Sequence, residues 1–220
     1  EKSQEWKRRI SMKKKELDYF TIDGGVGGNQ DWFQNVVMYM GGCAAATACD
    51  CCIDLARRKG MTNLYPFDPQ NLTREEYVRF AMQMKPYLKP RVGGVSKLWM
   101  FTEGFSRYLQ DAGEKKLRLQ EFSGERSARE AETFIRQQID SGFPVPYLML
   151  KHKKTCYKDF TWHWFLCYGY EETKEGFRIT VATYGEASSF LLEDLWETGY
   201  EEKGGLIGIS RDLKEKLTEM

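Results

Sequence analysis

The sequence has little of several features that would point directly to a function. Its 220 residues contain only two histidines and six prolines, and 33 Lys+Arg against 32 Asp+Glu leave a formal net charge of +1. Without an excess of one sign, no long-range field draws the chain to nucleic acid or to an acidic membrane. No stretch reaches the roughly 20 consecutive apolar residues of a membrane span, and no secretory signal is present. We therefore expect neither a nucleic-acid nor a membrane partner.

Cysteine is also sparse. Six cysteines in a chain of this length are too few for a disulfide scaffold, so we expect reduced thiols and a cytoplasmic protein, although the start at Glu1 in place of Met leaves export open. Cys49, Cys51 and Cys52 lie close together, but zinc usually takes Cys-x-x-Cys on a turn with a second pair elsewhere. Because these three fall in a helical pattern, packing as small apolar side chains is favoured over a zinc site. We expect no metal and no other cofactor.

Glycine is present, but not in a nucleotide-binding pattern. The glycine-rich segment at 24–28 lacks the G-x-G-x-x-G spacing and the P-loop Lys-Ser/Thr pair, so a flexible loop is predicted. Before it, the basic runs at 7–9 and 13–15 are diluted by acidic residues, which predicts a solvated arm over residues 1–21. With 41% hydrophobic residues, positions 22–220 are long enough for one domain with one core.

Apolar periodicity predicts four helices followed by a sheet. The helices are expected at 43–58, 73–86, 96–112 and 127–142, and short β-rich runs at 145–150, 162–170, 177–184, 188–192 and 206–209. On the first helix, a stripe of small and apolar residues comprises Ala45, Ala48, Cys49, Cys52, Ile53 and Ala56. The other side carries Thr47, Asp50, Asp54 and Arg57. Helices first and an antiparallel sheet afterwards is an α+β layout.

Cys43 differs from the other cysteines because it follows Gly41-Gly42 and begins the first predicted helix. A thiol is a good nucleophile as thiolate, and the partial positive charge of a helix N-terminus is expected to lower its pKa from about 8.5. The two glycines let the backbone turn tightly and leave N–H groups open to an oxyanion. Cys43 is therefore the candidate nucleophile.

A cysteine nucleophile needs a base, and the chain offers two histidines. His152 stands among lysines in an apparent surface loop, which predicts a solvated side chain. His163 lies in an aromatic run that predicts a strand with one face in the core, with Trp162 and Trp164 on the face opposite His163. A lone histidine on such a strand is commonly a packing residue. However, a helix-start cysteine far upstream of a strand histidine is the arrangement of a thiol–imidazole pair, which favours His163 as the base.

Several segments resemble the papain-like cysteine peptidase superfamily. They are GGCAA at 41–45, SGFPV at 141–145, His163 leading into GYE at 169–171, and ITVATYG at 179–185. The resemblance follows the element order over about residues 22 to 210 and is greatest to the bacteriocin-processing (double-glycine) peptidases and their bacterial relatives. It implies helices packed on a C-terminal antiparallel sheet, a cleft between them, Cys43 as nucleophile and His163 as base.

Two positions depart from the family pattern. The Asn or Asp that orients the histidine in papain-like enzymes corresponds here to Ala182, so Thr183 or a backbone carbonyl is the candidate substitute. The oxyanion glutamine that the family places a few residues before the cysteine is also absent. Gln30 is the favoured candidate, with Gln34, Asn35 or a plain loop role as alternatives.

The residues and the resemblance together predict a thiol hydrolase, specifically a cysteine peptidase with a peptide or protein substrate. Acyl or amide transfer by the same Cys43–His163 pair is one alternative. The other is a catalytically degenerate binding module, which Ala182 and the displaced glutamine would suit. The sequence carries no signal for an oligomeric state.

Overall fold

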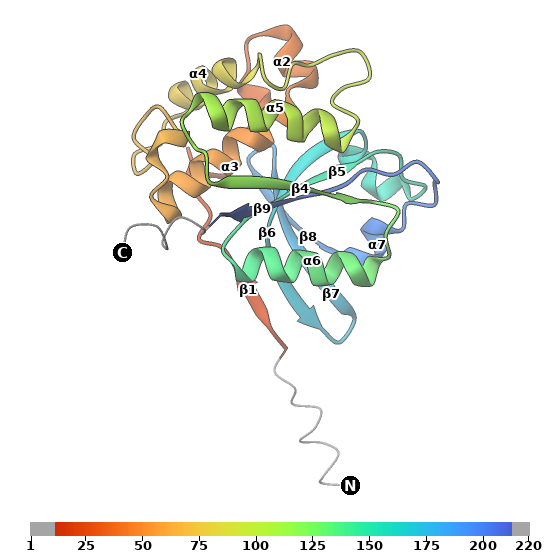
Figure 1. Ribbon diagram of the computed structural model, residues 1–220. Coiled ribbons are helices and arrows are strands. Elements are labelled where there is room, and N and C mark those ends of the chain that lie inside the picture. The colour runs from red at the N-terminus through yellow and green to blue at the C-terminus, as the bar shows by residue number, and fades with distance from the viewer. Residues whose placement is uncertain (1–11, 213–220) are drawn as a thin grey trace, which may run out of the picture.

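Helix α3 (Cys43–Lys59) lies in the middle of the fold, where it packs against β6 (His163–Thr173) and α4 (Arg74–Met84). The computed structural model of the chain describes residues 12–212 (Figure 1). The other helices described are α2 (Val36–Gly41), α5 (Leu98–Asp111), α6 (Ala128–Asp140) and α7 (Leu192–Trp196). Short 3-10 helices lie at Gln30–Trp32, Thr62–Leu64 and Thr155–Phe160.

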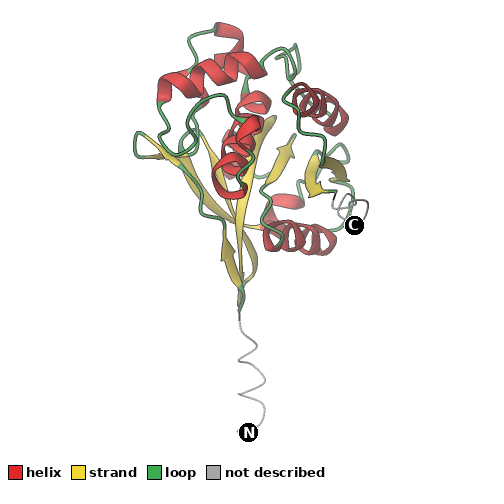
Figure 2. Cartoon of the chain, turned by 60° about the vertical axis from the view of Figure 1, so that its left-hand side comes forward, coloured by secondary structure: helices red, strands yellow, loops and turns green. Residues whose placement is uncertain are grey.

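The strands form one large antiparallel sheet and one small hairpin. They are β1 (Lys14–Glu16), β2 (Thr21–Ile22), β3 (Gly25–Val26), β4 (Leu117–Ser123), β5 (Val145–Met149), β7 (Gly176–Thr183), β8 (Glu186–Leu191) and β9 (Gly205–Arg211), besides β6. The sheet runs β4-β9-β5-β6-β7-β8, and β1 pairs with β6 beyond the end of β5. In Figure 2 several of the strands converge toward the lower end of the molecule, below most of the helices. The α+β class predicted from the sequence is thereby confirmed.

The predicted order, with helices first and strands afterwards, is wrong for β1, which precedes the helices, and for β4, which lies between α5 and α6 in the sequence. Strand β4 pairs with β9 along its whole length, from Leu117 opposite Arg211 to Ser123 opposite Gly205. Only Leu117 and Phe122 are buried within β4. A strand with so few buried positions has no clear two-residue alternation, and for this reason the pattern LRLQEFS did not predict it.

Both faces of the sheet are covered. Trp164 and Leu166 of β6 belong to one core with α3 and α5, and the Trp164 ring stacks on Phe101 of α5 at 4.4 Å between centroids. Phe165 and Cys167 point to a second core that includes α6. Figure 1 shows α3, α4 and α5 on one side of the sheet and α6 on the other. The prediction that the strand of His163 has only one face in the core is therefore wrong.

Part of the predicted solvated arm belongs to the fold. Strand β1 pairs with β6, and Leu17 and Phe20 are buried in the two cores. The arm predicted over 1–21 is therefore wrong for residues 14–21, while residues 1–11 lie outside the described part. The glycine-rich segment is also ordered, since β2 and β3 form a hairpin there and the Gly27 N–H donates to the Phe20 carbonyl at 2.9 Å.

Helix α3 is buried on all sides. Its apolar stripe is in the core as predicted, and Cys49, Cys51 and Cys52 are all buried free thiols. The side that carries Thr47, Asp50 and Asp54 is buried as well, because Asp50 has partners in other chain segments and Asp54 pairs with Arg58 one turn further along α3. Within residues 12–212, no group of side chains is arranged to hold a metal ion, and no helix has the length and apolar character needed to cross a membrane.

Asp54 and Arg58 form an ion pair that should be needed for stability. Arg58 Nη2 lies 2.5 Å from an Asp54 oxygen and donates to the Gly142 carbonyl at 2.8 Å, while the Asp54 side chain is fully buried. Replacing Arg58 by Met leaves that carboxyl without its partner, and we expect the free energy of unfolding in urea to fall by about 3 kcal/mol. Arg57→Met, one residue away and partly exposed, is the control and should change it by less than about 1 kcal/mol. Equal losses in both variants would contradict this account.

Candidate active site

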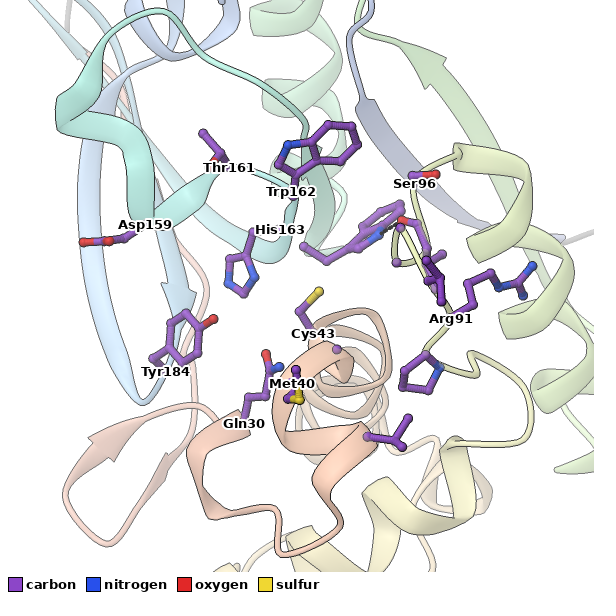
Figure 3. A pocket seen from close by; sticks show the side chains of 18 residues that line it. Gln30, Met40, Cys43, Arg91, Ser96, Asp159, Thr161, Trp162, His163 and Tyr184 are labelled. Atoms are coloured by element: carbon purple, nitrogen blue, oxygen red, sulfur yellow. Dashed lines mark hydrogen bonds between the residues drawn. The ribbon is translucent and has the colours of Figure 1, made fainter.

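Three of the predicted site residues line one cleft of about 850 Å³ (Figure 3). Cys43 lies on the floor of the cleft and His163 lies on one wall. Gln30 lies on the floor next to Cys43. The rest of the lining comes from α2, from residues 90–96, from Asp159, Thr161, Trp162 and Trp164, and from Tyr184. The fourth, Thr183, lies behind His163 and lines a small internal cavity that Cys43 and Gln30 share. The structure therefore brings together helix, loop and strand residues that are far apart in the sequence.

Gly42 allows α2 and α3 to meet at a sharp junction. Its N–H donates to the Met38 carbonyl at 2.8 Å, and a Cβ at this position would lie only 2.4 Å from that same oxygen. The φ angle of Gly42 is −85°, so glycine is required here by the close approach of the backbone rather than by a left-handed conformation. The junction places Cys43 as the first residue of α3.

The Gln30 side chain caps the C-terminal end of α2. Its Nε2 donates to the Tyr39 carbonyl at 2.9 Å, which is the carbonyl that the Cys43 N–H would use if α2 continued into α3. Its Oε1 is buried and has no hydrogen-bond partner among the described residues. In this conformation the amide donates to α2 rather than into the cleft, so an oxyanion role for Gln30 would require the amide to turn and stays a prediction.

The two alternatives to Gln30 do not reach the cleft. Asn35 accepts from the Met38 N–H at 3.1 Å and caps α2, and Gln34 is exposed. The donors nearest the Cys43 sulfur are backbone groups of Cys43, Ala44 and Trp164, which all act to lower the pKa of the thiol. Backbone N–H groups at the start of α3 are thus available to stabilise negative charge beside the sulfur.

His163 begins β6 and is 4% exposed. Its Nε2 lies 2.7 Å from the Thr183 hydroxyl oxygen, while Ala182 is buried in the core. The polar partner of the imidazole is thus Thr183, the residue that follows Ala182. In the tautomer in which Nε2–H donates to Thr183, the lone pair is on Nδ1, the nitrogen left to receive a proton.

Tyr184 is a site residue that the sequence interpretation missed. Its ring lies flat on His163, with centroids 4.9 Å apart and an angle of 4° between the rings. Its φ of 53° is in the left-handed region, which is costly for an aromatic residue. Such a backbone conformation persists where the surrounding packing and hydrogen bonds hold it. The signal in the sequence was Gly185, which follows Tyr184 at the turn between β7 and β8.

Trp162 and Trp164 do not share a strand face, contrary to the prediction. Trp162 precedes β6, has a φ of 52° and is 49% exposed at the cleft. Trp164 is buried, and its indole N–H donates to the Val95 carbonyl at 2.6 Å, which fixes the opposite wall of the cleft. Together with the exposed side chains of Val37 and Met40, Trp162 gives the cleft an apolar rim.

Burial sets the protonation of the candidate pair. Cys43 keeps some exposed surface, but desolvation raises the pKa of its thiol and outweighs the backbone N–H groups that lower it. Burial also lowers the pKa of His163 to about 4. No hydrogen bond joins the two side chains in the described structure. The predicted low-pKa thiol is therefore wrong, and the resting pair is a neutral thiol beside a neutral imidazole.

His152 is not solvated as predicted. Its Nδ1 accepts from the Lys154 N–H at 3.0 Å, and Nε2 lies 3.1 Å from the Asp194 carbonyl oxygen. Both ring nitrogens have partners, and the residue is not part of the cleft lining. His163 is the histidine that lines the cleft together with Cys43.

Comparisons of the chain with family models, with curated proteins and with solved structures found no match.

The junction at Gly42 should not tolerate a side chain. Gly42→Ala places a Cβ against the Met38 carbonyl, and we expect a loss of about 2 kcal/mol in the free energy of unfolding together with a displaced Cys43. Gly41→Ala is the control, because its Cβ would meet only the Pro90 side chain at 3.2 Å. Urea unfolding measures both variants. A Gly42→Ala protein as stable as Gly41→Ala would show that the junction is not constrained.

The pKa of His163 can be measured by NMR titration of the ring nitrogens. We expect a value near 4 because burial disfavours the imidazolium. The unfolded state, with a pKa near 6.5, then binds the proton first, so stability falls as the pH drops from about 6.5 to 4, by up to about 3 kcal/mol. His163→Gln removes this part of the pH dependence and also assigns the resonance. A His163 pKa of 6 or above would contradict the burial argument.

Proposed function

We propose that this protein is a papain-like cysteine hydrolase, a peptidase that cleaves peptide or protein substrates. The observation that carries the proposal is the hydrogen bond between His163 and Thr183, because it orients an imidazole in the same cleft as a cysteine at a helix start. Any buried histidine needs a partner for its ring N–H, so the proposal is supported by the occurrence of this bond together with a free thiol in the same cleft. The apolar rim suits a substrate with apolar side chains near the bond that is cleaved.

The neutral resting pair favours general-base activation of the thiol. As the Cys43 sulfur attacks the substrate carbonyl carbon, Nδ1 of His163 takes the thiol proton, a carbon–sulfur bond forms, and the carbonyl π electrons move to oxygen. The backbone N–H groups at the start of α3 stabilise that oxygen. The Thr183 hydroxyl accepts from Nε2–H and keeps the ring in the required tautomer.

The second half of the reaction returns the protein to its starting state. The tetrahedral intermediate collapses, the bond to the leaving nitrogen breaks, and the proton on His163 goes to that nitrogen. The resulting thioester on Cys43 reacts with water, from which His163 takes a proton, and the acid product leaves with the thiol restored. If an amine replaces water in this step, the same pair performs acyl transfer.

A non-catalytic binding module is the second candidate. The raised thiol pKa and the lack of a hydrogen bond between Cys43 and His163 favour it, because nothing in the resting state activates the sulfur. In that case the cleft would bind its ligand without turnover, and Cys43→Ser would leave binding intact.

The test is cleavage of a proteome-derived peptide mixture, with new N-termini identified by mass spectrometry. The wild type should generate new termini that Cys43→Ser and His163→Ala do not. On a substrate found in this way, Thr183→Val should lower kcat about a hundredfold because the imidazole loses its orientation, while Thr183→Ser keeps the hydroxyl and most of the activity. Termini that persist in Cys43→Ser, or none from the wild type, would overturn the peptidase proposal. Added amine that captures the acyl group would indicate a transferase.

A further inference from the structure

Asp50 is a buried carboxylate that the proposed mechanism does not use, although it lies two turns from Cys43 on α3. It accepts hydrogen bonds from the Tyr19 hydroxyl at 2.7 Å and from the Tyr77 hydroxyl at 2.8 Å. The Gly28 N–H also lies 3.2 Å from both of its oxygens. Three donors from separate parts of the chain therefore converge on one side chain.

Gly28 connects Asp50 to the turn beside the histidine. Its N–H faces Asp50, and its carbonyl accepts from the Gly185 N–H at 3.0 Å. The Gly185 carbonyl in turn accepts from the Val26 N–H at 2.8 Å. The segment of β3 and Gly28 is thus bound to α3 on one side and to the β7–β8 turn on the other.

The packing around Gly27 and Gly28 leaves no room for a side chain at either position. A Cβ on Gly28 would lie 1.9 Å from the Tyr77 ring, and one on Gly27 would lie 2.5 Å from an Asp50 oxygen. The β7–β8 turn carries Thr183, which bonds to the imidazole, and Tyr184, which stacks on it. A short path of hydrogen bonds therefore runs from the helix of the nucleophile to the residues that hold the base.

We propose that Asp50 is a positioning residue for the Cys43–His163 pair. Through Gly28 and Gly185 it holds the turn that carries Thr183 and Tyr184 at a constant distance from α3, and so determines where the imidazole lies relative to the thiol. This inference rests on the proposed thiol–imidazole function, but it concerns a residue that does not touch the cleft floor.

The role depends on the carboxylate form. A protonated carboxyl must itself donate one O–H and is a weaker acceptor than the carboxylate, so the hydrogen bonds from the two hydroxyls and the amide weaken. Burial raises the pKa of Asp50 to about 6, against the lowering effect of Tyr19, Tyr77 and Gly28, and Asp54 raises it further. The other titratable groups that interact with it are Cys49 and Cys51. Below pH 6 the hydrogen bonds from Tyr19, Tyr77 and Gly28 to Asp50 should therefore weaken while His163 is still neutral.

The test is the rate at which iodoacetamide alkylates Cys43, followed by mass spectrometry of the peptide that contains it, as a function of pH. At about pH 7.5 we expect Asp50→Asn to react about tenfold more slowly than the wild type, because the base is misplaced. At about pH 5 the two rates should agree within about twofold, since the wild type then carries a protonated Asp50. The ratio of the rates should change with a midpoint near 6.

Two further variants keep the test decisive. Tyr77→Phe removes a donor that lowers the pKa of Asp50, so the pH below which His163 no longer accelerates the alkylation of Cys43 should move above 6. This variant tests the positioning role if Asp50→Asn does not fold. Asp54→Asn changes a buried carboxyl on the same helix whose partner is Arg58, so at about pH 7.5 Cys43 should be alkylated at the wild-type rate. Because the Asp54 charge raises the pKa of Asp50, the midpoint in this variant should move below 6.

The outcomes separate this inference from the proposed function. If His163→Ala does not slow the alkylation of Cys43 at about pH 7.5, the thiol–imidazole pair itself is wrong. If His163→Ala slows it but Asp50→Asn matches the wild type, or lowers the rate by the same factor at every pH, the positioning role of Asp50 is overturned.

Discussion

The burial of α3 on every side is the constraint on which the rest of the structure depends. Its small side chains allow the helix to approach β6 closely, and its two carboxylates, Asp50 and Asp54, obtain partners within the protein rather than from water. A helix enclosed in this way has only its ends near solvent. The N-terminal end opens into the cleft, so the position of Cys43 follows from the way the core is packed.

The same burial determines the chemistry available at the cleft. Desolvation raises the pKa of Cys43 and lowers that of His163, and both effects favour the uncharged forms. The pair is therefore not a preformed ion pair, and in the proposed mechanism the sulfur becomes a nucleophile as its proton moves to the ring. For that mechanism the placement of the imidazole matters more than the resting charge, and Thr183, Tyr184 and the proposed Asp50 network all bear on this placement.

Much of the helical and strand content could be predicted from the sequence, because periodicity and caps are local. The capping box of Ser127 and Glu130 is present, and the helix predicted at 43–58 is α3. Strand β4 could not be predicted, since it is stabilised by pairing with β9, which lies about 90 residues later. Strand β1 could not be predicted either, because its sequence is charged and it forms only by pairing with β6.

The features of the candidate site likewise divide into those that the sequence predicts and those that depend on the tertiary structure. The sequence by itself determined that a cysteine after two glycines begins a helix, that one histidine begins an aromatic strand, and that the chain has an α+β layout. Only the tertiary structure decided that Thr183 rather than Ala182 bonds to the imidazole, that Gln30 directs its amide to α2, and that the thiol pKa rises. The physical reason is that hydrogen-bond partners and desolvation depend on neighbours distant in the chain, whereas helix starts and strand patterns depend on adjacent residues.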